Sequence, residues 1–182
     1  MDIYNCRSDL PVLLIDNLDL SWPQQDIQNC LATTRQMVDA LVEVGHPVQE
    51  VCIQSAELEP ALQGFSPDEY LIFNWCEELP GLEHSSNRVV QILEQMGFTY
   101  TGADAQALTL SQDKRLVKRL LQQCGIPTPA WQIYTSTQAI RWKSFPAIVK
   151  PAFEHCSYGI SREAVVESRA ELVQRLHYVF EE

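Results

Sequence analysis

The chain has 182 residues, of which 46% are hydrophobic and 20% charged, with a net charge of −11 at pH 7. This balance is typical of a soluble globular protein with enough apolar side chains to bury a core. No run approaches the ~18 apolar residues of a membrane span, and the first residues lack the basic and then apolar pattern of a secretory signal. We therefore predict a cytoplasmic protein with no membrane partner.

The charge is divided unevenly along the chain. Residues 1–110 contain 17 acidic and 3 basic residues, whereas residues 111–182 contain 7 acidic and 10 basic ones. The acidic first part argues against a nucleic-acid partner, because neutralising phosphates requires clustered Lys and Arg. We expect any bound anion to lie in the second part.

The six cysteines show no pattern of a metal or disulfide site. They stand at positions 6, 30, 52, 76, 124 and 156, with no Cys-x-x-Cys pair. Reduced thiols in a cytosolic protein fit this spacing better than a zinc site or a disulfide framework. The sequence predicts no metal ligands.

The first part alternates predicted strands and helices. Residues 11–16 form a short apolar run, and a helix is predicted from an N-cap at Ser21 to a stop at Gly45. Further strands are predicted near residues 48–53, 70–75 and 98–102, with a helix between the last two that ends at Gly97. This order predicts a Rossmann-like parallel α/β sheet.

A glycine-rich dinucleotide motif is absent after the first strand. Asp16-Asn17-Leu18-Asp19 stands there instead of Gly-x-Gly-x-x-Gly, which disfavours ordinary dinucleotide binding. A flavodoxin-like domain made of residues 1–110 is a weaker alternative, which a flavin chromophore would reveal.

The second part begins with a basic helix. Ser111 is predicted to cap it, and it runs over residues 112–124 to a stop at Gly125. Strands are predicted at residues 130–134, 145–150 and 160–166. A final helix follows the capping box Ser168-Arg169-Ala170-Glu171.

The most informative stretch is the strand that ends at Lys150. Pro151 to Gly159 follow it as a loop of mostly small residues that closes with Ser157-Tyr158-Gly159. A lysine at a strand end, followed by backbone N–H groups of such a loop, is a way to hold a phosphate. The alternative is a solvated lysine at a strand end.

Three motifs follow one another in order. They are Thr99-Tyr100-Thr101-Gly102-Ala103, then Gln112-Asp113-Lys114 with Gly125-Ile126-Pro127-Thr128-Pro129, and then Phe145-Pro146-x3-Lys150-Pro151 with its loop. In order and spacing they resemble the D-alanine-D-alanine ligases and their ATP-grasp relatives, over about residues 68–172.

The resemblance implies a fold and a division of the chain. Residues 1–110 would form the Rossmann-like pre-ATP-grasp domain, and residues 111–182 the small α+β subdomain of an ATP-grasp fold, incomplete at its end. The resemblance also implies the reaction, in which ATP phosphorylates a carboxylate and an amine displaces phosphate to form a peptide bond.

The same resemblance implies roles for individual residues. Lys150 and Ser157 would act in catalysis, Lys150 by holding α- and β-phosphate oxygens and Ser157 by offering a hydroxyl. Lys114 would be a second cation on the phosphate side. The nucleotide-binding set that the resemblance implies is Lys114, Lys150, Glu154, Cys156, Ser157 and Gly159.

Some residues depart from the family pattern. The loop reads Glu154-His155-Cys156-Ser157-Tyr158-Gly159 where the family usually has Glu-Gly-Ser-Ser-x-Gly, and Asn74-Trp75-Cys76-Glu77-Glu78 replaces a histidine-glycine motif. These departures indicate the broader ligase-like branch, in which the substrates are amino-acid-like but not necessarily D-alanine. Glu77 and Glu78 are read as a solvated turn or as substrate ligands.

In the family, the adenine-contacting linker and the acidic Mg²⁺ ligands lie beyond the position that corresponds to residue 182. We therefore expect the chain to be an N-terminal portion of an ATP- and Mg-dependent ligase, inactive by itself. The alternative is a non-catalytic module with a structural or dimerisation role, and a homodimer stays open under either reading.

Overall fold

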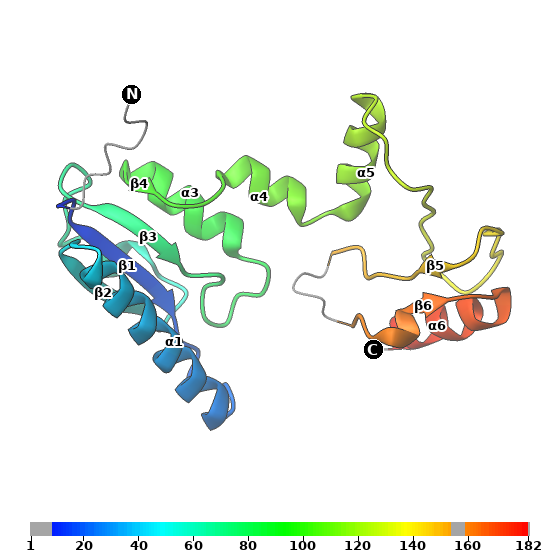
Figure 1. Ribbon diagram of the computed structural model, residues 1–182, viewed down its shortest axis with the longest axis horizontal. Coiled ribbons are helices and arrows are strands. Elements are labelled where there is room, and N and C mark those ends of the chain that lie inside the picture. The colour runs from blue at the N-terminus through cyan, green and yellow to red at the C-terminus, as the bar shows by residue number, and fades with distance from the viewer. Residues whose placement is uncertain (1–8, 154–158, 182) are drawn as a thin grey trace. The chain divides into compact units, whose positions relative to one another are not determined.

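The structure, a computed structural model, describes residues 9–153 and 159–181. The chain divides into two compact units, Met1–Leu108 and Thr109–Glu182 (Figure 1). The boundary falls inside helix α4 (Ala105–Ser111). In the part of the chain that is described, no helix is both long and apolar enough to cross a membrane.

The first unit is built on a four-stranded sheet in the order β2-β1-β3-β4, with every pair parallel. The central strand β1 (Val12–Asn17) is buried at all six positions, as expected for a strand covered on both faces. The other strands are β2 (Val48–Ile53), β3 (Leu71–Trp75) and β4 (Thr99–Tyr100). The predicted Rossmann-like parallel sheet is confirmed.

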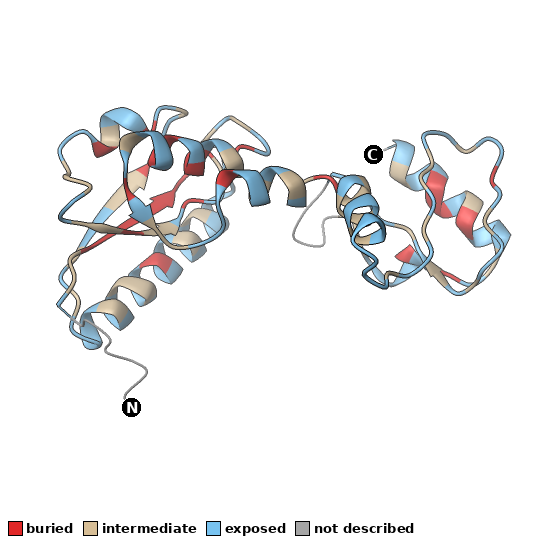
Figure 2. Cartoon of the chain, turned by 90° about the horizontal axis from the view of Figure 1, so that it is seen from above, coloured by how far each residue is buried: buried red, intermediate tan, exposed pale blue. Residues whose placement is uncertain are grey.

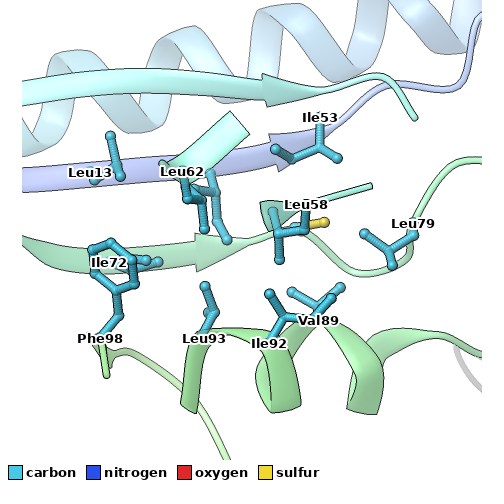
Figure 3. Close-up of a cluster of buried hydrophobic side chains, with 12 residues drawn as sticks. Leu13, Ile53, Leu58, Leu62, Ile72, Leu79, Val89, Ile92, Leu93 and Phe98 are labelled. Atoms are coloured by element: carbon cyan, nitrogen blue, oxygen red, sulfur yellow. The ribbon is translucent and has the colours of Figure 1, made fainter. Parts of the chain in front are cut away.

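Helices lie on both faces of this sheet (Figure 3). Helix α3 (Ser86–Met96) and the short α2 (Glu59–Leu62) cover the face that carries Leu13 and Ile15, and α1 (Gln24–Glu43) covers the opposite face. The buried core between the sheet and α2 and α3 consists of Leu13, Ile15, Ile53, Leu58, Leu62, Ile72, Cys76, Leu79, Val89, Ile92, Leu93 and Phe98.

The predicted glycine stops are where the helices end. At Gly97, φ is +80°, its N–H donates to Glu94 O, and the N–H of Phe98 donates to Leu93 O. Gly125 ends the basic helix in the same way, with φ of +67°. This pair of bonds is the Schellman arrangement, which needs a left-handed residue and so favours glycine.

The second unit contains a small antiparallel sheet covered by one helix. Strands β5 (Ala147–Ile148) and β6 (Val165–Val166) pair, and α6 (Arg169–Glu181) packs on them through Leu172 and Leu176. The 3-10 helix η1 (Arg162–Ala164) precedes β6. Helix α5 (Lys114–Gln123) has no buried residue, in contrast to α3 and α6 (Figure 2).

Two predicted helix caps were wrong. Ser21 does not cap α1, because its N–H and hydroxyl both donate to the carboxylate of Asp19 and Pro23 directly precedes the helix. Ser111 is the last residue of α4, and Asp113 caps α5 instead. The Ser21 hydroxyl is bonded to Asp19 instead of to the helix, whereas Asp113 lies directly before α5 and its carboxylate accepts from the N–H of Arg115.

Two predicted strands were also wrong or too long. Residues 130–134 form no strand, since the Tyr134 hydroxyl accepts hydrogen bonds from the N–H groups of Arg141 and Trp142 and its ring packs on the second core. Of residues 160–166, only β6 is a strand. Apolar side chains can pack into a core from irregular backbone as well as from a strand. Their alternation along the sequence therefore did not require strand pairing here.

Candidate functional site

Lys150 lies one residue beyond the paired end of the small sheet. Ile148 of β5 is the register partner of Val165 in β6, and the N–H of Val149 donates to the carbonyl oxygen of Ala164 over 2.8 Å. Pairing therefore continues to the residue before Lys150, which is exposed. A fixed strand end holds the base of a flexible lysine side chain.

One face of this small sheet carries exposed apolar side chains. Ile148 is 50% and Val165 48% exposed, and because they are register partners their side chains share a face. Val149 and Val166 face the core that α6 covers. Strand alternation puts Lys150 on the same face as Ile148. An apolar surface and a cation thus lie side by side, a combination that sequence reasoning missed because it depends on the register of β6.

The first residue of helix α5 contacts the segment after Lys150. The main-chain N–H of Lys114 donates to the carbonyl oxygen of Ala152 over 3.1 Å. The preceding Asp113 caps the helix, since its carboxylate accepts from the N–H of Arg115 at 2.8 Å and from the guanidinium of the same residue at 2.7–3.2 Å. These bonds from Arg115 hold the pKa of Asp113 down at about 2.

Arg115 then reaches the next residue of the same segment. Its guanidinium carbon lies 4.4 Å from the centre of the Phe153 ring, a cation–π contact. Helix α5 therefore holds two consecutive residues, Ala152 and Phe153, by a backbone bond and a side-chain contact. The structure thus brings the start of α5 and the segment after Lys150 together. Sequence reasoning missed this role of Arg115, because only the folded chain brings Arg115 and Phe153 together.

Gly159, which follows the loop, lies beside the residue directly after Lys150. Its φ is +64°, and a side-chain carbon at this position would lie 3.5 Å from Cγ of Pro151. Its carbonyl oxygen accepts a hydrogen bond from the guanidinium of Arg175 on α6. The two ends of the predicted phosphate loop, Pro151 and Gly159, are therefore neighbours.

The remaining predicted site residues, Glu154, Cys156 and Ser157, lie outside the described residues, and their roles stay predictions. Within residues 9–153 and 159–181, no group of three His, Cys, Asp or Glu side chains is placed to hold a metal ion. The expectation that the magnesium ligands lie beyond the position of residue 182 stays a prediction.

In the first unit, polar groups gather at the carboxyl ends of β1 and β3. The amide oxygen of Asn17 accepts from the N–H of Glu77 at 3.0 Å, and that of Asn74 accepts from the N–H of Cys76 at 3.2 Å. The carboxylate of Glu78 accepts from the N–H of His84 at 3.0 Å. These bonds hold the backbone of residues 76, 77 and 84, and the choice between a solvated turn and substrate ligands for Glu77 and Glu78 stays open. In open parallel sheets ligands bind at such a point, where strand order reverses.

Asp16, at the end of β1, is the buried acid of this region. It is 1% exposed, Oδ2 accepts from the Thr34 hydroxyl at 3.1 Å, and Oδ1 has no hydrogen-bond partner in the described part of the chain. Burial raises the pKa of its carboxyl, and the bond from Thr34 offsets only part of that rise.

No protein-family model matches the chain, but several known proteins are similar to it in sequence. The D-alanine–D-alanine ligase of Aquifex aeolicus is 35% identical over 145 residues, which cover 78% of this chain and 47% of that protein. An uncharacterized protein of Sinorhizobium fredii is 31% identical over 165 residues, covering 87% of this chain and 46% of that protein.

The fold of the chain is similar to that of a solved structure. The crystal structure of D-alanine–D-alanine ligase from Bacillus anthracis complexed with ATP has a TM-score of 0.65 at 21% identity, covering 94% of this chain and 55% of that chain. The chain spans about half the length of the relatives that it matches.

Proposed function

We propose that this chain, a relative of the D-alanine–D-alanine ligases that matches an N-terminal portion of them, supplies one wall of the ATP site of a carboxylate–amine ligase. The carrying observation is the exposed pair Ile148 and Val165 next to Lys150 on one sheet face. A nucleotide presents an apolar base beside a chain of phosphates, and this face presents an apolar surface beside a cation.

The helix start adds to this surface. Lys114 is the first residue of α5, and its backbone is bonded to the segment that follows Lys150. Two lysines fixed by a strand end and a helix start are suited to triphosphate oxygens, because phosphoryl transfer depends on positioning and charge stabilisation. Ser157 and the loop residues Glu154 and Cys156 would complete the phosphate side.

The proposed reaction has two steps. A carboxylate oxygen attacks the γ-phosphorus of ATP, which forms an acylphosphate and releases ADP. An amine nitrogen then attacks the acyl carbon, phosphate leaves, and the nitrogen loses a proton to give an amide. Lys150 and Lys114 would hold the phosphates in line for the first step. We assign no described residue a role in the second step.

The substrates that we propose are an amino-acid-like carboxylate and amine. The named relatives are D-alanine–D-alanine ligases. His155 and Cys156, which stand where that family usually has glycine and serine, are the sequence reason to test other amino acids beside D-alanine.

Nucleotide titration tests the proposal. Replacing Lys150 by alanine is expected to weaken ATP binding by about 10- to 100-fold, since a charge-assisted hydrogen bond contributes roughly 1.5–3 kcal/mol. Lys143, an exposed lysine outside the strand, is the matched control, and its alanine variant should bind as the wild type does. Equal ATP affinity of the wild type and Lys150→Ala would contradict the assignment.

A second candidate is a non-catalytic ATP-grasp-like module with a structural or dimerisation role. The observation behind it is that the chain matches only about half the length of each relative. An assay of Mg²⁺-dependent ADP release by this chain with D-alanine and other amino acids separates the two. Turnover would exclude the module, whereas ATP binding without turnover, together with a dimer in light scattering, would support it.

A further inference from the structure

Arg175 is a charged residue in a core position. It is 8% exposed and lies on α6 between the core residues Leu172 and Leu176. Burying a guanidinium costs free energy unless hydrogen bonds and contacts compensate, and apolar replacements of buried charges are often neutral or stabilising. Packing alone therefore does not explain why an arginine stands at this buried position.

Its contacts are specific. One terminal nitrogen donates to the carbonyl oxygen of Gly159, and the guanidinium carbon lies 4.4 Å from the centre of the Tyr178 ring. Its Nε is buried and has no partner among the described residues. The side chain is therefore held between a ring of its own helix and one backbone oxygen, which lies at the returning end of the loop.

That backbone oxygen belongs to Gly159, which lies beside Pro151. Gly159 lies close enough that an added side-chain carbon would be 3.5 Å from Pro151 Cγ, and Pro151 directly follows Lys150. The outgoing end of the loop is held by α5 through Lys114 and Arg115. Arg175 holds the returning end from α6.

We propose that Arg175 is a positioning residue, which fixes the backbone of Gly159 and, because Gly159 lies beside Pro151, the place of Lys150 for the nucleotide phosphates. The inference rests on the proposed nucleotide site for its purpose, but the fixing of the backbone can be measured without nucleotide.

The experiment compares Arg175→Met and Arg175→Lys with the control Arg169→Met, a residue on the exposed side of the same helix. Methionine keeps an apolar stem of similar reach and removes the donors, while lysine keeps one cationic donor. For each full chain we would measure backbone ¹⁵N order parameters, the urea unfolding midpoint, and the affinities for ATP and for adenosine.

In Arg175→Met we expect the order parameters of Gly159 and Ile160 to fall from about 0.85 toward 0.6, while those of Leu172 and Leu176 and the unfolding midpoint stay unchanged. ATP binding should weaken about tenfold, adenosine binding should not change, and Arg175→Lys should recover part of the ATP affinity.

Unchanged order parameters at Gly159 and Ile160 would overturn the inference, as would a loss of order spread over the whole of α6 with a lower midpoint, because Arg175 would then be a core residue only. If the wild type binds no ATP, the proposed function fails, and the order parameters alone decide the role of Arg175.

Discussion

The backbone of Lys114 is bonded to the backbone of Ala152, with 3.1 Å between the donor nitrogen and the acceptor oxygen. This bond joins the first residue of α5 to the segment that follows Lys150. It uses one of the N–H groups that a helix start leaves without an intrahelical partner. The relative placement of the two lysine-bearing segments thus depends on α5 beginning at the right residue.

Asp113 decides where α5 begins, so we expect Asp113→Ala to loosen the Lys114–Ala152 contact and to weaken ATP binding several-fold. Asp113→Asn is the matched control, because asparagine caps helices about as well but cannot form the ion pair with Arg115. Titration calorimetry with ATP checks both. If the alanine variant binds ATP as the wild type does, the start of α5 has no part in the site.

The same cap has a pH dependence with a defined sign. The pKa of Asp113 is about 2 in the folded chain, below its ordinary value of 3.8. Its contribution to stability is therefore complete above pH ~3.8 and is lost as the pH falls toward 2. Circular dichroism between pH 5 and 2 should show that helix content of the wild type falls more steeply than that of Asp113→Asn.

The contribution of Asp16 to stability is expected to change with pH in the opposite direction from that of Asp113. Burial raises the pKa of its carboxyl above 3.8, so its contribution is complete below that pH and is lost as the pH rises through the folded-state pKa. Asp16→Asn keeps an acceptor for the Thr34 hydroxyl and removes the charge. It should be more stable than the wild type at pH 7, by of order 1 kcal/mol, with the difference shrinking toward pH 4.

Urea unfolding at several pH values measures this difference, with the exposed Asp26→Asn as control. A difference between wild type and Asp16→Asn that stays constant from pH 4 to 8 would mean that Asp16 does not titrate in this range.

The sequence predicted the features that neighbouring residues determine. The run Val12–Asn17 is apolar enough to require a strand buried on both faces, and Gly97 and Gly125 end helices because few other residues adopt a positive φ. Lys150 was placed at a strand end because the apolar residues before it and the proline after it leave few other structures.

Features that depend on distant residues were not predicted. Asp113 was missed as a cap because Ser111 is also a good capping residue, and only the bonds to Arg115 decide between them. Nothing near Arg175 in the sequence indicates that its partner is the carbonyl of Gly159. The exposure of Ile148 follows from the register of a strand that lies far along the chain.

Gly97 allows a direct test of the helix-end argument. With φ of +80° and no atom within 4 Å of an added side-chain carbon, Gly97→Ala suffers only the backbone cost, which is about 1–2 kcal/mol. Gly64 also has open space around it but no positive φ, so Gly64→Ala should be neutral or slightly stabilising. Equal unfolding midpoints for the two variants would show that α3 does not need a left-handed residue at its end.

A variant of Ile148 tests whether the base and the phosphates bind where we propose. Because Ile148 is half-exposed and shares its face with Val165 and Lys150, Ile148→Ala should leave the unfolding midpoint nearly unchanged yet weaken adenosine and ATP binding alike, by about three- to tenfold. Lys150→Ala should weaken ATP only. Titrating both variants with ATP and with adenosine gives four affinities. The proposed orientation requires that Ile148→Ala weaken both ligands and that Lys150→Ala weaken only ATP. If Ile148→Ala affects ATP but not adenosine, the apolar pair does not contact the base, and the proposed orientation of the nucleotide is wrong.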